Sequence, residues 1–154
     1  MYIWKIENLK NDIRDKNISE YHIFIYFMIF LILTYLLIDM EYIWPSQELN
    51  TWDTIGSIVS SILAITATII MFVLNGGKTG KDFFLKYFSL SFVGSIRYLV
   101  FTMPVLAIPF IYVVINIEAD SDISTTATET LVFFIWELGL YAYICKHIYQ
   151  VKNS

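Results

Sequence analysis

Cysteine and charged residues are both scarce in this chain. Its 154 residues include a single cysteine, Cys145, so no disulfide can form within the chain and cysteine usage does not indicate a redox compartment. Lys, Arg, Asp and Glu make up only 16% of the residues, whereas 57% are hydrophobic and the mean hydropathy is +0.62. Soluble domains carry about 25% charged residues, so the composition excludes an ordinary soluble domain and indicates a membrane protein.

Patterns that carry catalysis or ligand binding are also missing. His22 and His147 have no Cys, His, Asp and Glu cluster around them with the spacing of a metal site. No Ser/His/Asp or Cys/His pattern of a nucleophile with its base is recognisable. We therefore predict no catalytic residue, no metal and no cofactor, and we expect neither an enzyme nor direct binding of nucleic acid.

Residues 75–84 read NGGKTGKDFF and at first sight suggest a nucleotide site. A P-loop has the pattern G-x-x-x-x-G-K-[ST], in which backbone amides cradle the phosphates and the hydroxyl binds magnesium. Around Gly80, however, the required first glycine is Asn75 and the required hydroxyl is replaced by Asp82. In the other register the first glycine is replaced by Phe72. The stretch follows a long apolar segment rather than a short strand, so we interpret it as a loop after a membrane span.

Four apolar stretches are long enough to cross the hydrocarbon of a bilayer, about 30 Å thick, at 1.5 Å per residue. They predict an all-α fold, a polytopic membrane bundle of four transmembrane helices that takes up residues 1–154 as a single domain. The first span begins after about twenty residues and no small-x-small cleavage site follows it, so we expect an anchor rather than a cleaved signal peptide. The expected spans are 23–38, 54–74, 92–117 and 127–148.

The basic residues divide cleanly between the two sides of such a bundle. Four lie before the first span, four around the loop between the second and third spans, two in the C-terminal tail, and none in the other two loops. Cytoplasmic loops carry such an excess, so the pattern predicts the bacterial inner membrane with both termini in the cytoplasm. The opposite side carries Trp44 and Trp52 as interface residues, together with Asp39, Glu41, Glu48, Asp53, Glu118, Asp120, Asp122 and Glu129.

Two short interfacial helices are expected on the basic side. In the segment 1–21, Tyr2, Ile6, Leu9 and Ile13 recur at helical spacing with charges between them. This pattern predicts a helix that rests on the membrane surface, either as a plain flanking segment or as a docking site for a partner.

The second interfacial helix is expected between the second and third spans. Gly76 and Gly77 end the second span, because glycine takes the left-handed conformation that satisfies the last helical carbonyls. Thr79 and Asp82 have the spacing of a capping box, which predicts a new helix that lies in the interface before the third span. The alternative is a third span that begins earlier and tilts.

One face of the second span is built from small residues. They are Gly56, Ser60, Ala64 and Ala67. Small side chains let two helix backbones approach closely, so this face predicts a helix contact. The contact lies either within the chain or between subunits, and the lining of a wet pore is a further alternative.

Two charged residues lie within the predicted spans. Glu137 is near the middle of the fourth span, and Arg97 is about one turn inside the basic end of the third. An isolated charge at mid-membrane costs several kcal/mol, so such residues usually face the bundle interior and find partners. We predict a structural pair of Arg97 with Glu137, or a Glu137 that is simply protonated. The alternative is a path for protons or ions through Glu137.

The pattern GG-x-x-GKDF-x-x-x-YFSL, followed by Arg97, resembles small bacterial inner-membrane proteins. The layout of four short-looped spans is also similar to membrane subunits of anti-phage defence systems of the Kiwa or Rex type. The resemblance implies a subunit in the lipid bilayer that assembles with itself or with a soluble cytoplasmic partner, as a sensor or pore-type component. It carries over no site residue. The alternative is a small transporter or ion-coupling protein that uses Glu137.

Overall fold

The computed structural model describes residues 2, 4–43, 50–116 and 126–152, and these residues form helices and turns without a strand. Segments 44–49 and 117–125, with half of the acidic residues expected on one side, lie outside the described residues. The helices of the described part are α1 (Ile6–Arg14), α2 (Glu20–Ile43), α3 (Thr51–Leu74), the 3-10 turn η1 (Gly77–Thr79), α4 (Phe83–Asn116) and α5 (Ala127–Gln150).

Three of these helices are long and apolar enough to cross a membrane. They are α3, the Phe83–Val105 part of α4, and α5. The described apolar part of α2, Glu20–Leu33, is shorter than a full span. The chain is therefore an all-helical membrane protein with three candidate spans. The first of the four expected spans, 23–38, lies within α2.

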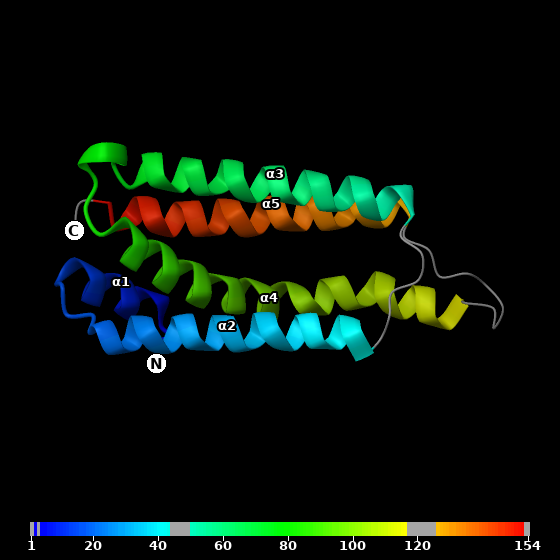
Figure 1. The fold of residues 1–154 in the computed structure, drawn as a ribbon, viewed down its shortest axis with the longest axis horizontal. Coiled ribbons are helices and arrows are strands. Elements are labelled where there is room, and N and C mark those ends of the chain that lie inside the picture. Colours follow the sequence, from blue (N-terminus) through cyan, green and yellow to red (C-terminus); the bar gives the residue numbers. More distant parts are fainter. Residues whose placement is uncertain (1, 3, 44–49, 117–125, 153–154) are drawn as a thin grey trace.

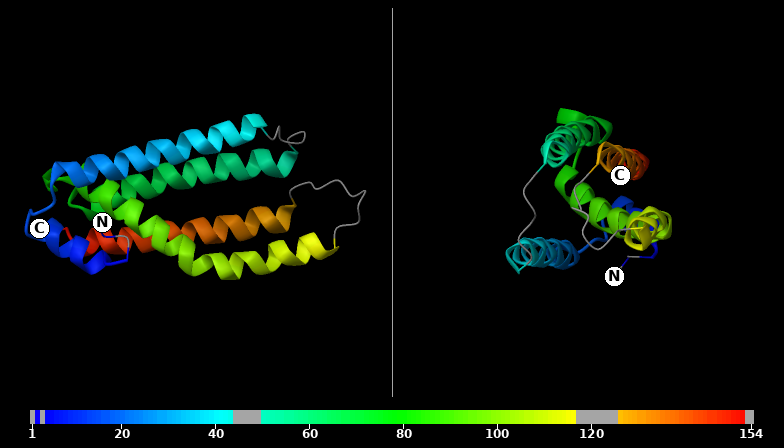
Figure 2. Two further views of the ribbon diagram at one scale, coloured as in Figure 1. Left: turned by 90° about the horizontal axis from the view of Figure 1, so that it is seen from below. Right: turned by 90° about the vertical axis from the view of Figure 1, so that its right-hand side faces the viewer.

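The long helices form an open row rather than a closed bundle. Helix α3 packs against α5, α5 against α4, and α4 against α2. Helices α2 and α4 meet at one end through the stacked rings of Tyr26 and Phe92, 5.0 Å apart, and the edge-to-face rings of Phe27 and Phe88. They diverge toward the other end, and α2 stands apart from α3 and α5 (Figures 1 and 2).

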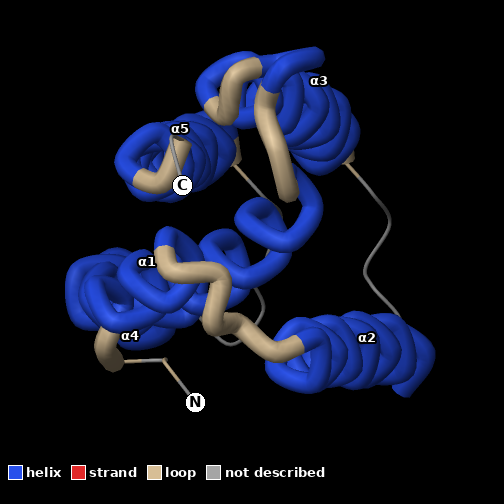
Figure 3. Tube along the Cα trace, turned by 90° about the vertical axis from the view of Figure 1, so that its left-hand side faces the viewer, coloured by secondary structure: helices blue, strands red, loops and turns tan. Residues whose placement is uncertain are grey.

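The two ends of the row differ in charge. We call the end that holds α1, η1, the start of α4 and the end of α5 the basic end, because the Lys and Arg residues of the loops and tails lie there (Figure 3). The opposite, acidic end holds the starts of α3 and α5, and each of these starts is closed by a capping box. Asn50 and Asp53 form the first of these boxes, and Thr126 and Glu129 form the second.

Helix α1 packs against the chain's own helices. Its apolar residues Ile6, Leu9 and Ile13 are buried, as the periodicity predicts, but they face protein rather than a membrane surface. Lys10 donates a hydrogen bond to the Gln150 side chain at 2.8 Å. Lys10 also bonds Glu7, which lowers the pKa of the Glu7 carboxyl against a smaller opposing effect of burial. The segment is thus a structural cap on the basic end.

The predicted interfacial helix between the second and third spans is wrong. Helix α4 is continuous over Phe83–Asn116, so the third span begins earlier, as in the alternative. The Thr79 hydroxyl donates to the Gly76 carbonyl, and the next helix begins only at Phe83, so Thr79 is not its N-cap. The prediction for the glycines is confirmed, because Gly76 and Gly77 have φ angles of 110° and 57° after the end of α3.

Candidate functional site

Two of the small residues of α3, Gly56 and Ser60, contact α5. A Cβ added at Gly56 would lie 3.4 Å from the Thr130 methyl group of α5, and Ala67 is 4% exposed. Close approach of the two backbones requires side chains of this size. The structure thus places the small-residue face of Gly56, Ser60, Ala64 and Ala67 on the helix that packs against α5 within the chain.

Glu137 lies in this contact. The Ser60 hydroxyl of α3 donates a hydrogen bond of 2.7 Å to Glu137 Oε2 of α5. At 1.5 Å per residue, Glu137 is about 15 Å from the start of α5 and about 20 Å from its end. A partly buried carboxyl group with one hydroxyl donor therefore lies in the central part of a candidate span. Either charge state of the carboxyl accepts this bond, since one oxygen is always an acceptor.

Arg97 has a different partner. Its Nη1 donates a hydrogen bond of 2.7 Å to the Trp4 carbonyl, and its guanidinium lies 6.0 Å from the centre of the Phe101 ring. This hydrogen bond joins Arg97 of α4 to the N-terminal segment, and its acceptor is a neutral backbone carbonyl rather than a carboxylate. Arg97 lies about 21 Å along α4 from the start of the helix at Phe83.

Within one chain the structure does not bring Arg97 and Glu137 together. Among the described residues the ion pair within 4.0 Å is Lys10 with Glu7. The reason is geometric: α5 presents Glu137 to α3, whereas Arg97 of α4 is turned toward the N-terminal segment. The depths of Arg97 and Glu137 along their helices are compatible with an ion pair. The rotation of each helix about its own axis, however, turns the two side chains toward different partners. A pair between two copies stays a prediction.

A second polar network joins α5 to α4 and was missed by sequence reasoning. The Trp136 indole donates to the Thr102 hydroxyl at 2.8 Å, and the Tyr98 hydroxyl donates to the Trp136 carbonyl at 3.2 Å. A Cβ added at Gly139 would collide with the Tyr98 hydroxyl. The glycine in WELGLY was the available signal, because a glycine within a membrane helix often marks a close helix contact.

The histidines and the cysteine occupy structural positions. His22 Nδ1 bonds the Ser19 hydroxyl at 2.8 Å at the start of α2. His147 is buried at the end of α5, edge-on to the Tyr143 ring. Cys145 is half-buried beside the core. Over the described part of the chain, no group of three His, Cys, Asp or Glu side chains could hold a metal ion.

Comparisons with protein-family models, with curated proteins and with solved structures find no match to this chain. The class of protein therefore rests on the fold and the site alone. They define an all-helical membrane protein with a carboxyl group and a serine in contact between two candidate spans.

Proposed function

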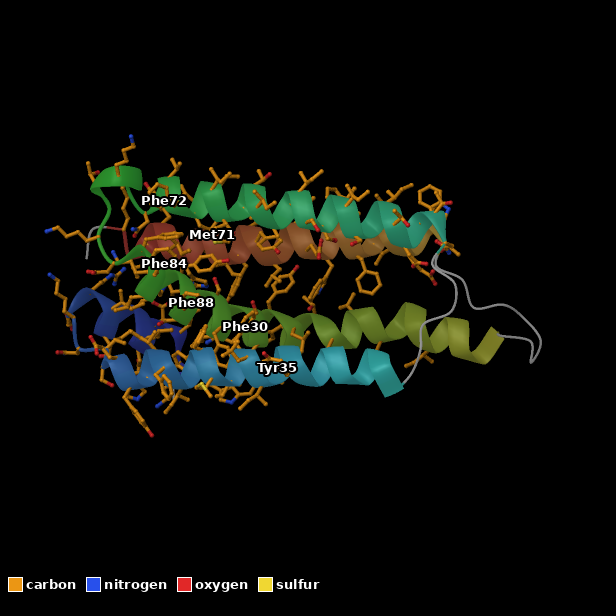
Figure 4. The ribbon with its side chains drawn as sticks, in the orientation of Figure 1. Phe30, Tyr35, Met71, Phe72, Phe84 and Phe88 are labelled. Atoms are coloured by element: carbon orange, nitrogen blue, oxygen red, sulfur yellow. The ribbon has the colours of Figure 1, made fainter. Side chains whose placement is uncertain are left out.

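We propose that this protein is a small four-span subunit of the bacterial inner membrane that acts by assembling with itself or with a soluble cytoplasmic partner. The observation that carries the proposal is the position of α2, which packs mainly against α4. Phe30, Leu33 and Tyr35 on α2 are exposed, and Figure 4 labels the first and last of them on this helix. A helix attached along only part of its length leaves a long surface on which another membrane helix can pack.

Another copy of the chain is the proposed partner for this surface. In a bilayer, lipid tails are as apolar as leucine, so association depends on shape and polar contacts rather than on hydrophobicity. An apolar hollow lined by α2 residues and by Phe88 of α4 offers shape, and the exposed Tyr35 side chain of α2 offers a polar contact. The layout shared with membrane subunits of anti-phage systems supports a sensor or pore-type role in defence.

Single-cysteine cross-linking tests the assembly. In a Cys145→Ser background, Leu33→Cys on α2 and Ile62→Cys on α3 are a matched pair, because both positions are exposed. Their depths also match: Leu33 is about 20 Å from the start of α2, and Ile62 about 18 Å from the end of α3. We expect a bis-maleimide to cross-link the Leu33→Cys variant into dimers in native membranes and to leave Ile62→Cys monomeric.

Equal cross-linking at both positions would indicate random collision and would contradict an interface at α2. A monomer by native mass measurement from nanodiscs, with no cross-link at either position, would overturn assembly with itself. Assembly with a soluble cytoplasmic partner would then remain as the proposed mode of action.

The orientation rests on the distribution of charge. We propose that the basic end faces the cytoplasm, because its lysines and arginines match the excess found in cytoplasmic loops. Cysteine labelling is expected to place Gly77 and Ser154 inside, and Gln47 and Ser121 outside. If residue 121 is labelled only after the cells are broken, the acidic end faces the cytoplasm and the proposed orientation is wrong.

A second candidate function is the coupling of proton or ion movement to Glu137. The hydrogen bond from Ser60 favours it, because this contact holds an ionisable group between two candidate spans. We expect proteoliposomes to show a pH-gradient or ion flux that Glu137→Gln abolishes without loss of folding, since the amide keeps the shape but cannot ionise. Ser60→Ala is the matched control, because it removes the donor and keeps the carboxyl. Absence of flux in the wild-type protein would exclude this candidate.

A further inference from the structure

A polar cavity of about 340 Å³ opens at the basic end, away from the contact of Ser60 with Glu137. It is lined by three lysines from three separate parts of the chain: Lys16 before α2, Lys81 before α4 and Lys152 after α5. The remaining lining residues are Asn75, Gly76, Thr79 and Gly80. The fold therefore brings together basic residues that the sequence keeps far apart.

The lining of this cavity carries charge of one sign. Among the described residues that line it, the charged side chains are the three lysines, and no carboxylate is among them. Three ammonium groups around one cavity repel one another, and an anion between them removes this repulsion. The cavity is thus electrostatically suited to an anionic ligand.

The wall of the cavity is firmly built. The Asn75 side chain is 1% exposed, and its Nδ2 donates to the Lys81 carbonyl at 3.2 Å, which fixes the backbone that carries Lys81. Gly80 lies so close to the Asn75 backbone that a Cβ would collide with it. Lys81, which lines the cavity, is therefore mounted on a fixed loop.

The loop cannot bind phosphate as a P-loop does. The backbone amides of Asn75 and Gly76 donate to carbonyls of α3, and those of Thr79 and Gly80 donate to carbonyls of Gly76 and Gly77. Since these four amides are occupied, the lysine ammonium groups are the charged donors that the lining offers to an anion. Lysine binds phosphate as a point charge, and basic clusters beside membrane helices attract phosphate headgroups.

We propose that Lys16, Lys81 and Lys152 bind a phosphate group in this cavity. The volume lies at the lower end of small-molecule pockets, about 300–1,000 Å³, and accommodates a phosphate with part of the group it is esterified to. The phosphate belongs either to the headgroup of an anionic lipid or to a soluble phosphate compound. Both sources present the same charged oxygens to the lysines. The inference is independent of assembly and of Glu137.

The test compares two triple variants with the same change in net charge. The cavity variant carries Lys16→Gln, Lys81→Gln and Lys152→Gln. The control variant carries Lys5→Gln, Lys78→Gln and Lys146→Gln, which alter exposed lysines that do not line the cavity. Binding is measured in nanodiscs, first by native mass spectrometry of retained phosphatidylglycerol, and then by thermal stabilisation with inorganic phosphate in nanodiscs of phosphatidylcholine alone.

We expect the cavity variant to weaken binding by about fivefold for each lysine, since a lysine near a phosphate surface contributes about 1 kcal/mol. The control variant is expected to keep binding within about twofold. Loss in the lipid arm alone identifies a headgroup site, and loss in the phosphate arm identifies a soluble ligand. Equal loss in both variants means general surface attraction and overturns the site, as does absence of binding to the wild type in both arms. If the triple variant does not fold, the three single variants give the same comparison.

Discussion

The two halves of the helix row are built differently. Near the basic end, α1 and one half of each long helix enclose a core in which Leu9, Tyr26, Leu90 and Ile148 are at most 1% exposed. In the opposite half, the described apolar side chains are largely exposed, as Phe101 and Phe133 are. Hydropathy is high in both halves. Apolar composition therefore puts a helix in the membrane without deciding where it packs, because lipid competes equally for apolar surface.

The largest effect is expected from truncating one buried and one exposed isoleucine of α5. Ile148 is 0% exposed at the basic end, whereas Ile135 is 59% exposed in the other half. Ile148→Ala leaves a cavity and is expected to cost about 2 kcal/mol or more of unfolding free energy. Ile135→Ala is expected to change it by less than about 0.5 kcal/mol, as for other exposed sites. Unfolding in bicelles measures both.

Equal losses for these two variants would mean that the acidic half is also packed in the membrane. A second copy of the chain over Ile135 would then be the simplest explanation, and the contrast between the two halves would hold only for the isolated chain.

An intermediate effect is expected at Gly139, between the two halves. Because a Cβ there meets the Tyr98 hydroxyl, Gly139→Ala is expected to destabilise the protein by about 1–3 kcal/mol through overpacking. The double variant with Tyr98→Phe is expected to recover part of the loss, since it removes the atom in the collision. Additive effects in the double-mutant cycle would contradict this contact.

The smallest effect is expected for the coupling between Arg97 and Glu137. Because the two residues have separate partners in Trp4 and Ser60, the interaction energy in a cycle of Arg97→Leu and Glu137→Leu is expected to stay within about 0.5 kcal/mol. The cycle is measured by unfolding in bicelles at a dilution that keeps the chain monomeric. A coupling above about 1 kcal/mol would show that the pair forms.

The helices themselves follow closely from the sequence. The spans expected at 54–74 and 127–148 lie within α3 and α5, because runs of apolar residues must satisfy their backbone hydrogen bonds internally in a membrane. The buried face of α1 and the left-handed Gly76 and Gly77 also follow from local chemistry. The separate helix expected before the third span is wrong, because the apolar residues from Phe83 onward continue the same helix into that span.

By itself the sequence determined the class of protein, the candidate spans and the separation of charge, since each depends on composition along one segment. Only the tertiary structure decided which residues meet. The rotation of each helix about its axis places Glu137 against Ser60 and Arg97 against Trp4. The fold also brings Lys16, Lys81 and Lys152, from three separate segments, to the lining of one cavity. The physical reason is that a contact between helices depends on the angle, tilt and register of both partners, and none of these is a property of one segment alone.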